Sequence, residues 1–153
     1  MIKEEIGLFN DLLSNTVLWI AVACWAAAQV LKLILYSIHS GKLEIERLFG
    51  AGGMPSSHTS TVCGLTVGVA RIYGLSSPLF TLSLVLACIV MYDATGVRRA
   101  AGEHAKVLNQ LLFSDGESMT PSQKALKEFL GHTPLEVLGG AVLGVVLGLV
   151  MPV

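Results

Sequence analysis

Residues 17–38 have the sequence VLWIAVACWAAAQVLKLILYSI, in which Lys32 is the single charged residue. As an α-helix this stretch is about 33 Å long, enough to cross the roughly 30 Å hydrocarbon core of a bilayer. Across the whole chain of 153 residues, 53% are hydrophobic and 14% are charged, and the mean hydropathy is +0.69. The stretch therefore predicts a membrane-spanning helix, and the composition predicts an integral membrane protein.

Three further apolar segments predict helices that cross the membrane, at residues 57–73, 79–92 and 134–151. The first is rich in small residues and only about 26 Å long as a helix, so we expect its start to be sunk in a polar pocket. Glycines spaced four apart predict helix-contact faces, at Gly64 and Gly68 and again at Gly140, Gly144 and Gly148. The predicted fold class is an all-α, polytopic membrane helical bundle of about four spans, built as a single domain over residues 1–153.

Two regions outside these spans are predicted to lie at the membrane interface. Within residues 1–15, an apolar stripe at helical spacing indicates an amphipathic anchoring helix over residues 2–13. Residues 93–133 are mixed in charge, with breaks at 114–116 and 120–121. They predict two short amphipathic helices that carry part of the functional site.

The charge and cysteine patterns exclude several classes of function. The formal net charge is −1 and the basic residues are not clustered, so no nucleic-acid partner is expected. Cys24, Cys63 and Cys88 lie inside apolar runs without metal-ligand spacing, which indicates packing between helices. We expect neither a metal nor another cofactor.

Ionisable side chains gather at one end of the predicted bundle, where such costly groups are usually functional. Four alternating spans place the following residues at this end: Lys32, His58, Asp93 and Glu136 within the spans, and Arg98, Arg99, His104 and His132 in the connecting segments. The excess of Lys and Arg predicts that this end faces the cytoplasm, in a bacterial inner membrane. The opposite orientation is the alternative.

The sequence Gly-Gly-Met-Pro-Ser-Ser-His at residues 52–58 stands where a polar loop becomes an apolar helix. That position brings backbone N–H groups, two hydroxyls and an imidazole to a helix N-terminus, which is a favourable anion site. A phosphate is the expected anion.

Within this motif, residues 55–58 resemble the second signature, Pro-Ser-Gly-His, of the type 2 phosphatidic acid phosphatase superfamily, with Ser57 in place of the glycine. Together with residues 92–98 (YDATGVR) and 131–136 (GHTPLE), the motif resembles the divergent branch of that superfamily. The resemblance implies a membrane phosphatase that works through a phosphohistidine, without a metal. Its implied substrates are lipid phosphates: phosphatidylglycerophosphate, phosphatidate or polyprenyl pyrophosphate.

The resemblance also implies roles for individual residues. His58 takes the place of the general acid, and Ser56 and Ser57 take the place of phosphate contacts. His132 followed by Glu136 keeps the spacing of the nucleophile and its orienting acid, whereas His104 keeps the spacing to Arg98 but has Leu108 where the family has aspartate. His132 is therefore the first candidate nucleophile and His104 the second. Lys32 takes the place of the lysine of the family's first signature, which is degraded in this chain. Lys32, Arg98 and Arg99 are the candidate phosphate-binding cations.

The residues support the same chemistry without the family. A carboxylate four residues after a histidine lies on the same helix face, so Glu136 can hold one ring nitrogen of His132 and leave the other free to attack phosphorus. Nearby cations would offset the charge of the phosphoryl group. Asp93 is expected to be a structural partner of Arg98 or Lys32.

Each of these features also has an ordinary structural explanation. The serines of the motif can be helix N-caps, Lys32 can extend to the interface, and the arginines can anchor the chain to anionic lipid. The alternative functions are a non-catalytic lipid-phosphate binding or transport protein and a structural membrane subunit. The glycine faces also suggest a homodimer.

Overall fold

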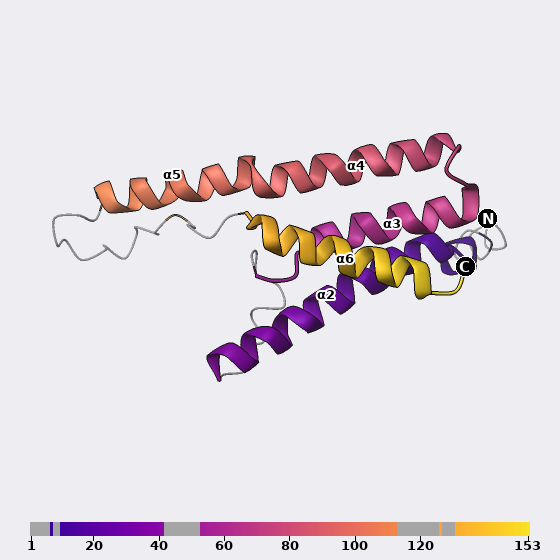
Figure 1. Ribbon diagram of the computed structural model, residues 1–153, viewed down its shortest axis with the longest axis horizontal. Helices are drawn as coiled ribbons and strands as arrows, with labels where there is room; N and C mark the ends of the chain where they lie inside the picture. Colours follow the sequence, from indigo (N-terminus) through magenta and orange to yellow (C-terminus); the bar gives the residue numbers. More distant parts are fainter. Residues whose placement is uncertain (1–6, 8–9, 42–52, 113–125, 127–130) are drawn as a thin grey trace.

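The computed structural model describes residue 7 and residues 10–41, 53–112, 126 and 131–153. In these ranges the regular elements are all helices, which confirms the all-α prediction (Figure 1). They are α2 (Thr16–Ser40), α3 (Ser57–Tyr73), α4 (Pro78–Thr95), α5 (Val97–Leu112) and α6 (Pro134–Val150). The predicted interfacial helix at residues 2–13 lies mostly outside the described residues.

The four predicted apolar helices form, because capping residues stand at their ends. The Asn15 side chain accepts a hydrogen bond from the Leu18 N–H at 3.0 Å and begins α2. Gly41 ends that helix with a φ of 67°, a left-handed conformation that glycine adopts without strain. The largest difference from the predicted bounds is at the end of α4, which reaches Thr95 rather than Tyr92.

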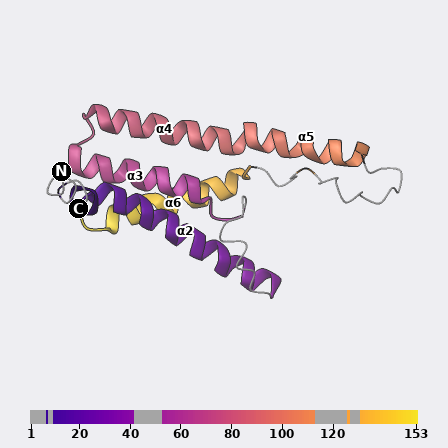
Figure 2. The same ribbon diagram turned by 180° about the vertical axis from the view of Figure 1, so that it is seen from behind.

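Helix α3 lies at the centre of the bundle and packs against α2, α4 and α6. Figure 1 and Figure 2 show α3 and α6 starting at the same end of the molecule, where α4 finishes. The start of α2 and the C-terminus lie near the opposite end. The end at which α3 and α6 start is called the site end below, because it carries the ionisable residues.

Glycines bring the backbones of α3 and α6 into direct contact. We call Gly140, Gly144 and Gly148 the glycine ladder. A Cβ added at Gly140 would lie 2.4 Å from the Ser56 carbonyl oxygen, and one added at Gly144 would lie 2.3 Å from the Ser60 carbonyl oxygen. Both are impossible contacts, so the predicted contact faces are confirmed. The ladder is buried against α3, and a homodimer stays a prediction.

A side-chain clamp holds α6 against α3 at the opposite end. Arg71, in the last turn of α3, donates from Nη1 to the carbonyl oxygens of Gly148 at 2.8 Å and Met151 at 2.6 Å. These carbonyls belong to the end of α6, where backbone acceptors lack helical partners. The clamp therefore holds the C-terminal end of α6 against α3, while the glycine ladder holds the rest of α6 along α3.

Helix α5 continues the line of α4 instead of turning away from it. Figure 1 and Figure 2 show α5 extending beyond the starts of α3 and α6. The interruption predicted at residue 93 falls instead at Gly96, because Asp93 and Thr95 still belong to α4. One glycine is too short an interruption to impose a change of direction. The second amphipathic helix predicted within residues 93–133 falls mostly outside the described residues, and the interfacial location of this region stays a prediction.

Within the described ranges, two helices are long and apolar enough to cross a membrane: α2 and the continuous pair α4 and α5 over Pro78–Leu111. Large apolar side chains point outward from the bundle: the exposed fraction is 68% for Leu82, 60% for Ile89 and 59% for Leu138. Such a surface suits contact with lipid. Helix α6 is a shorter apolar helix of 17 residues, and the count of four spans stays a prediction.

The glycine ladder generates the first testable prediction. In Gly144→Ala, the new Cβ meets the Ser60 carbonyl oxygen and, at 2.9 Å, the Cys63 Cβ, so overpacking should reduce stability by about 1–3 kcal/mol. Thermal unfolding of the detergent-solubilised protein measures the change. Gly68→Ala is the control, because its new Cβ meets the end of a side chain, Ile20 Cδ1 at 3.1 Å, and no backbone atom. Equal stability of Gly144→Ala and the wild type would contradict the backbone contact.

Candidate functional site

The segment before α6 is held on the junction between α4 and α5. The His132 backbone N–H donates to the Ala94 carbonyl oxygen at 2.9 Å. Gly131 has a φ of 91°, and a Cβ there would lie 2.5 Å from the Arg99 backbone nitrogen. The positive φ and the close backbone contact both require glycine at position 131. Gly131 was not among the predicted site residues. The one sequence feature that could have indicated its role is its position directly before His132.

Helix α6 begins with a capping box. The Glu136 N–H donates to Thr133 Oγ1 at 3.3 Å, and the Thr133 N–H donates to Glu136 Oε2 at 3.0 Å. This reciprocal pair satisfies two donors at a helix start. The sequence analysis missed Thr133, although Thr-Pro-Leu-Glu at residues 133–136 has the spacing typical of this motif.

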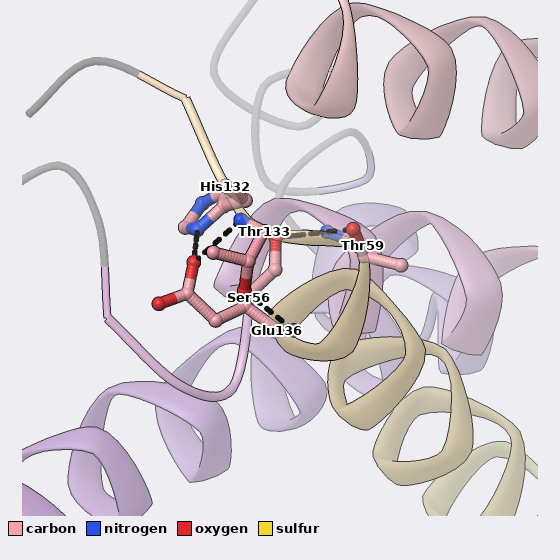
Figure 3. A network of polar contacts seen from close by, with 5 residues as sticks. All are labelled: Ser56, Thr59, His132, Thr133 and Glu136. Carbon is pink, nitrogen blue, oxygen red and sulfur yellow. Dashed lines mark hydrogen bonds and ion pairs between the residues drawn. The ribbon is translucent and has the colours of Figure 1, made fainter. Parts of the chain in front are cut away.

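The same carboxylate oxygen also holds the imidazole of His132. Nδ1 of His132 lies 3.1 Å from Glu136 Oε2, and Figure 3 shows His132 and Thr133 both directed toward Glu136. An ionised carboxylate only accepts hydrogen bonds, so Nδ1 carries the proton. In the neutral ring Nε2 then keeps its lone pair. The exposed side-chain fractions are 7% for His132 and 22% for Glu136, so the pair is shielded from water.

Ser56 begins α3 as its N-cap. Its Oγ accepts hydrogen bonds from the Thr59 N–H at 3.4 Å and the Thr59 hydroxyl at 3.0 Å, and the residue has no exposed surface (Figure 3). The Ser56 hydroxyl is therefore buried and serves the helix start, and its contact with phosphate stays a prediction. Ser57 is also buried, at 5% exposure, whereas His58 is exposed.

Several charged residues of the site end act electrostatically on His58. It lies within electrostatic range of four residues from other elements: Arg98, His132, Lys32 and Asp93. The ring centroids of His58 and His132 are 6.4 Å apart, with the rings tilted by 57°. Two imidazoles and charges of both signs thus share one small region.

Lys32 is buried, with 6% of its surface exposed. Its aliphatic stem lies under Gly53, where an added Cβ would be 3.2 Å from Cγ and 3.3 Å from Cδ. The charge of Glu136 acts on the ammonium group. Lys32 therefore belongs to the same electrostatic cluster as the His132–Glu136 pair. Gly53, with a φ of 92°, is a second glycine to which the sequence analysis gave no role.

Arg98 forms an ion pair with Asp93, as the sequence analysis expected of one of the two cations. Arg98 Nε lies 2.5 Å from Asp93 Oδ2, and the exposed side-chain fractions are 54% and 36%. The structure places Arg99 on the exposed side of α5, with its backbone against Gly131. Asp93 thus holds Arg98 at the edge of the site.

His104 lies apart from the other candidates. It is exposed on α5, ten residues beyond Ala94, or about 15 Å further along a helix. Ala94 is the residue whose carbonyl holds the His132 segment. Because α5 extends away from the starts of α3 and α6 (Figure 1), the structure brings His132, and not His104, next to His58 and Glu136.

Comparison with known proteins identifies the family. The family described as "Divergent PAP2 family" matches residues 13–147. The chain belongs to the divergent PAP2 family. It is also 42% identical, over 152 residues, to the uncharacterized membrane protein YuiD of Bacillus subtilis (strain 168), with 92% of this chain and 96% of that protein covered. No solved structure matches. The family match confirms the resemblance inferred from residues 52–58, 92–98 and 131–136. The similarity of this divergent PAP2 protein to a membrane protein agrees with the two long apolar helices among the described residues.

The shared oxygen of Glu136 gives the second testable prediction. In Glu136→Gln the side chain loses its charge and gains an NH2 group, which can donate to Nδ1 when the ring proton is on Nε2, so the His132 ring should populate both neutral tautomers instead of holding its proton on Nδ1. Nitrogen NMR of histidine-labelled protein measures this, and the chain has four histidines to assign. The signals of His39 and His104 are internal controls. An unchanged His132 tautomer would show that Glu136 does not orient the ring.

Proposed function

We propose that this divergent PAP2 protein is a membrane lipid-phosphate phosphatase that acts through a phosphohistidine on His132. The observation that carries the proposal is the pairing of His132 Nδ1 with Glu136 Oε2 at 3.1 Å. The ring centroid of His58 lies 6.4 Å from that of His132. One imidazole is oriented to attack, and the second stands close enough to serve the same phosphoryl group.

In the proposed first step, Nε2 of His132 attacks phosphorus and forms a P–N bond. The P–O bond to the lipid breaks, and protonated His58 gives its proton to the leaving oxygen. In the second step, His58 takes a proton from water, the hydroxide attacks phosphorus, and the P–N bond breaks to release phosphate. Both histidines return to their starting states, so the cycle balances.

The cations of the site end support this chemistry by offsetting the negative charge of the phosphoryl oxygens. Lys32 is held within the cluster, and Arg98 and Arg99 lie at its edge. The Arg98–Asp93 ion pair is partly exposed, and such pairs contribute only about 0–1 kcal/mol. Arg98 can therefore turn from Asp93 to a phosphate at small cost.

The proposed substrates are lipids with a terminal phosphate monoester or pyrophosphate, namely phosphatidylglycerophosphate, phosphatidate or polyprenyl pyrophosphate. The apolar outer surface of the helices would hold the chain in the bilayer beside the acyl or prenyl chains. The site lies at the end of the helices, where a lipid headgroup would meet it.

A second candidate function is non-catalytic binding or transport of a lipid phosphate. Ser56 favours it, because a hydroxyl that the family resemblance assigns to phosphate is used here as a helix cap. The degraded first signature around Lys32 favours it as well. Turnover by the purified protein separates the two functions.

The third prediction tests the phosphatase directly. Purified wild-type protein should release phosphate from at least one lipid phosphate of the panel in the presence of a chelator. His58→Ala and His132→Ala should lose release, because each removes one of the two imidazoles. His104→Ala is the matched control and should retain it.

The outcomes of this experiment separate the alternatives. An acid-labile phosphoryl group trapped on wild type but not on His132→Ala would support the intermediate. Loss of release in His104→Ala with retention in His132→Ala would overturn the assignment of the nucleophile. Binding without release by the wild type would favour the second candidate function.

We further propose a multi-pass location in the bacterial inner membrane with the site facing the cytoplasm. The support is a charge bias among the described residues: Arg98, Arg99 and Lys106 lie at the site end, whereas Arg71 lies at the other. YuiD, which is named a membrane protein, comes from a bacterium.

The fourth prediction tests this orientation. Lys106→Cys and Ser76→Cys place a thiol at exposed positions toward the site end and the opposite end. In intact cells, a membrane-impermeant maleimide should label Ser76→Cys and spare Lys106→Cys until the cells are opened. The wild type controls for the three native cysteines. The reverse pattern would place the site outside the cytoplasm.

A further inference from the structure

We propose that Gly140 is a positioning residue, which sets the separation of His58 and His132 through its contact with the backbone of Ser56. The proposal rests on the phosphatase function proposed above. It assigns a catalytic consequence to a residue that carries no functional group.

The two histidines stand on different elements, so their separation depends on how those elements meet. His58 is the second residue of α3, and His132 comes directly before Thr133, the N-cap of α6. Neither histidine fixes the other, because their ring centroids are 6.4 Å apart. The junction between the starts of α3 and α6 must therefore set the spacing.

Ser56, the N-cap of α3, makes this junction. Its backbone N–H donates to the Glu136 carbonyl oxygen at 3.0 Å. Its own carbonyl oxygen faces Gly140, one turn further along α6, where a Cβ would lie 2.4 Å away. Ser56 is fully buried and Gly140 is buried. The residue two positions before His58 is thus bonded to the carbonyl of the residue that orients His132.

An alanine at position 140 would break this junction without touching either histidine. Its Cβ would meet the Ser56 carbonyl oxygen and, at 3.0 Å, the Thr59 Cβ, so the starts of α3 and α6 must separate. The His132–Glu136 pair lies within four residues of one chain segment and would move with α6. The distance to His58 would grow while the orientation of the His132 ring is kept.

The test compares Gly140→Ala with Gly139→Ala in the full-length, detergent-solubilised protein. A Cβ at Gly139 meets the flexible end of Met54, Cε at 3.2 Å, so this control makes the same chemical change beside a movable neighbour. We expect Gly140→Ala to lower kcat by about 100-fold, the cost of a misplacement of about 1 Å. We expect KM to change far less and the His132 tautomer to stay as in the wild type. Gly139→Ala should match the wild type.

Amide hydrogen exchange at Ser56 tests the junction independently of activity. Gly140→Ala should expose this amide, and Gly139→Ala should leave it protected. Protection retained in Gly140→Ala overturns the junction, and exposure with unchanged kcat overturns the positioning role. A wild type that hydrolyses no lipid phosphate overturns the proposed function and the positioning role together, while the Ser56 amide still reports whether the junction exists.

Ser56→Ala keeps the proposal falsifiable if Gly140→Ala does not fold. It adds no atom and removes only the cap of Thr59, which should loosen the start of α3. A fall in kcat relative to the wild type, with the backbone amide at position 56 exposed and the His132 tautomer preserved, supports the positioning role. An unchanged kcat together with an exposed Ser56 amide overturns it.

Discussion

The close approach of α3 and α6 is the constraint on which the rest of the structure depends. Lipid tails are as apolar as the helices they surround, so packing rather than apolar burial must hold such helices together. The glycine ladder lets the α6 backbone reach the carbonyl oxygens of Ser56 and Ser60, and Arg71 clamps the far end of α6. Because both helices start at the same end (Figure 1), their contact also fixes the two segments that carry the histidines.

Most of the fold follows from local patterns in the sequence. The apolar runs are bounded by residues such as Asn15, Ser77 and Gly41, which cap helices whatever surrounds them. The direction of α5 is different. Its start at Val97 follows a single glycine, Gly96, and one glycine permits a turn or a straight continuation. Only contacts with other segments decide between them, such as the bond from His132 to Ala94, and those contacts are not local in sequence.

The site also has features that local sequence predicts and features that depend on distant contacts. The pairing of His132 with Glu136 was predictable because four residues bring both side chains to one face at a helix start. The burial of Ser56 was not predictable, because a serine at a helix start can cap the helix or face a ligand, and its contact with α6 is not local in sequence. The choice between His132 and His104 likewise depends on a distant residue, Ala94.

The position of Glu136 bears on whether this divergent PAP2 protein turns over a phosphate or only holds one. A carboxylate within 3.1 Å of an imidazole weakens a pure anion site, because it repels the phosphate that the site would retain. The same carboxylate helps nucleophilic attack, because it keeps the proton on Nδ1 and stabilises the positive charge that the ring gains when Nε2 bonds to phosphorus. An interaction that weakens binding of the substrate but stabilises the transition state accelerates a reaction, and such interactions are typical of enzymes. The geometry of His132 and Glu136 therefore supports the turnover that we propose rather than retention alone.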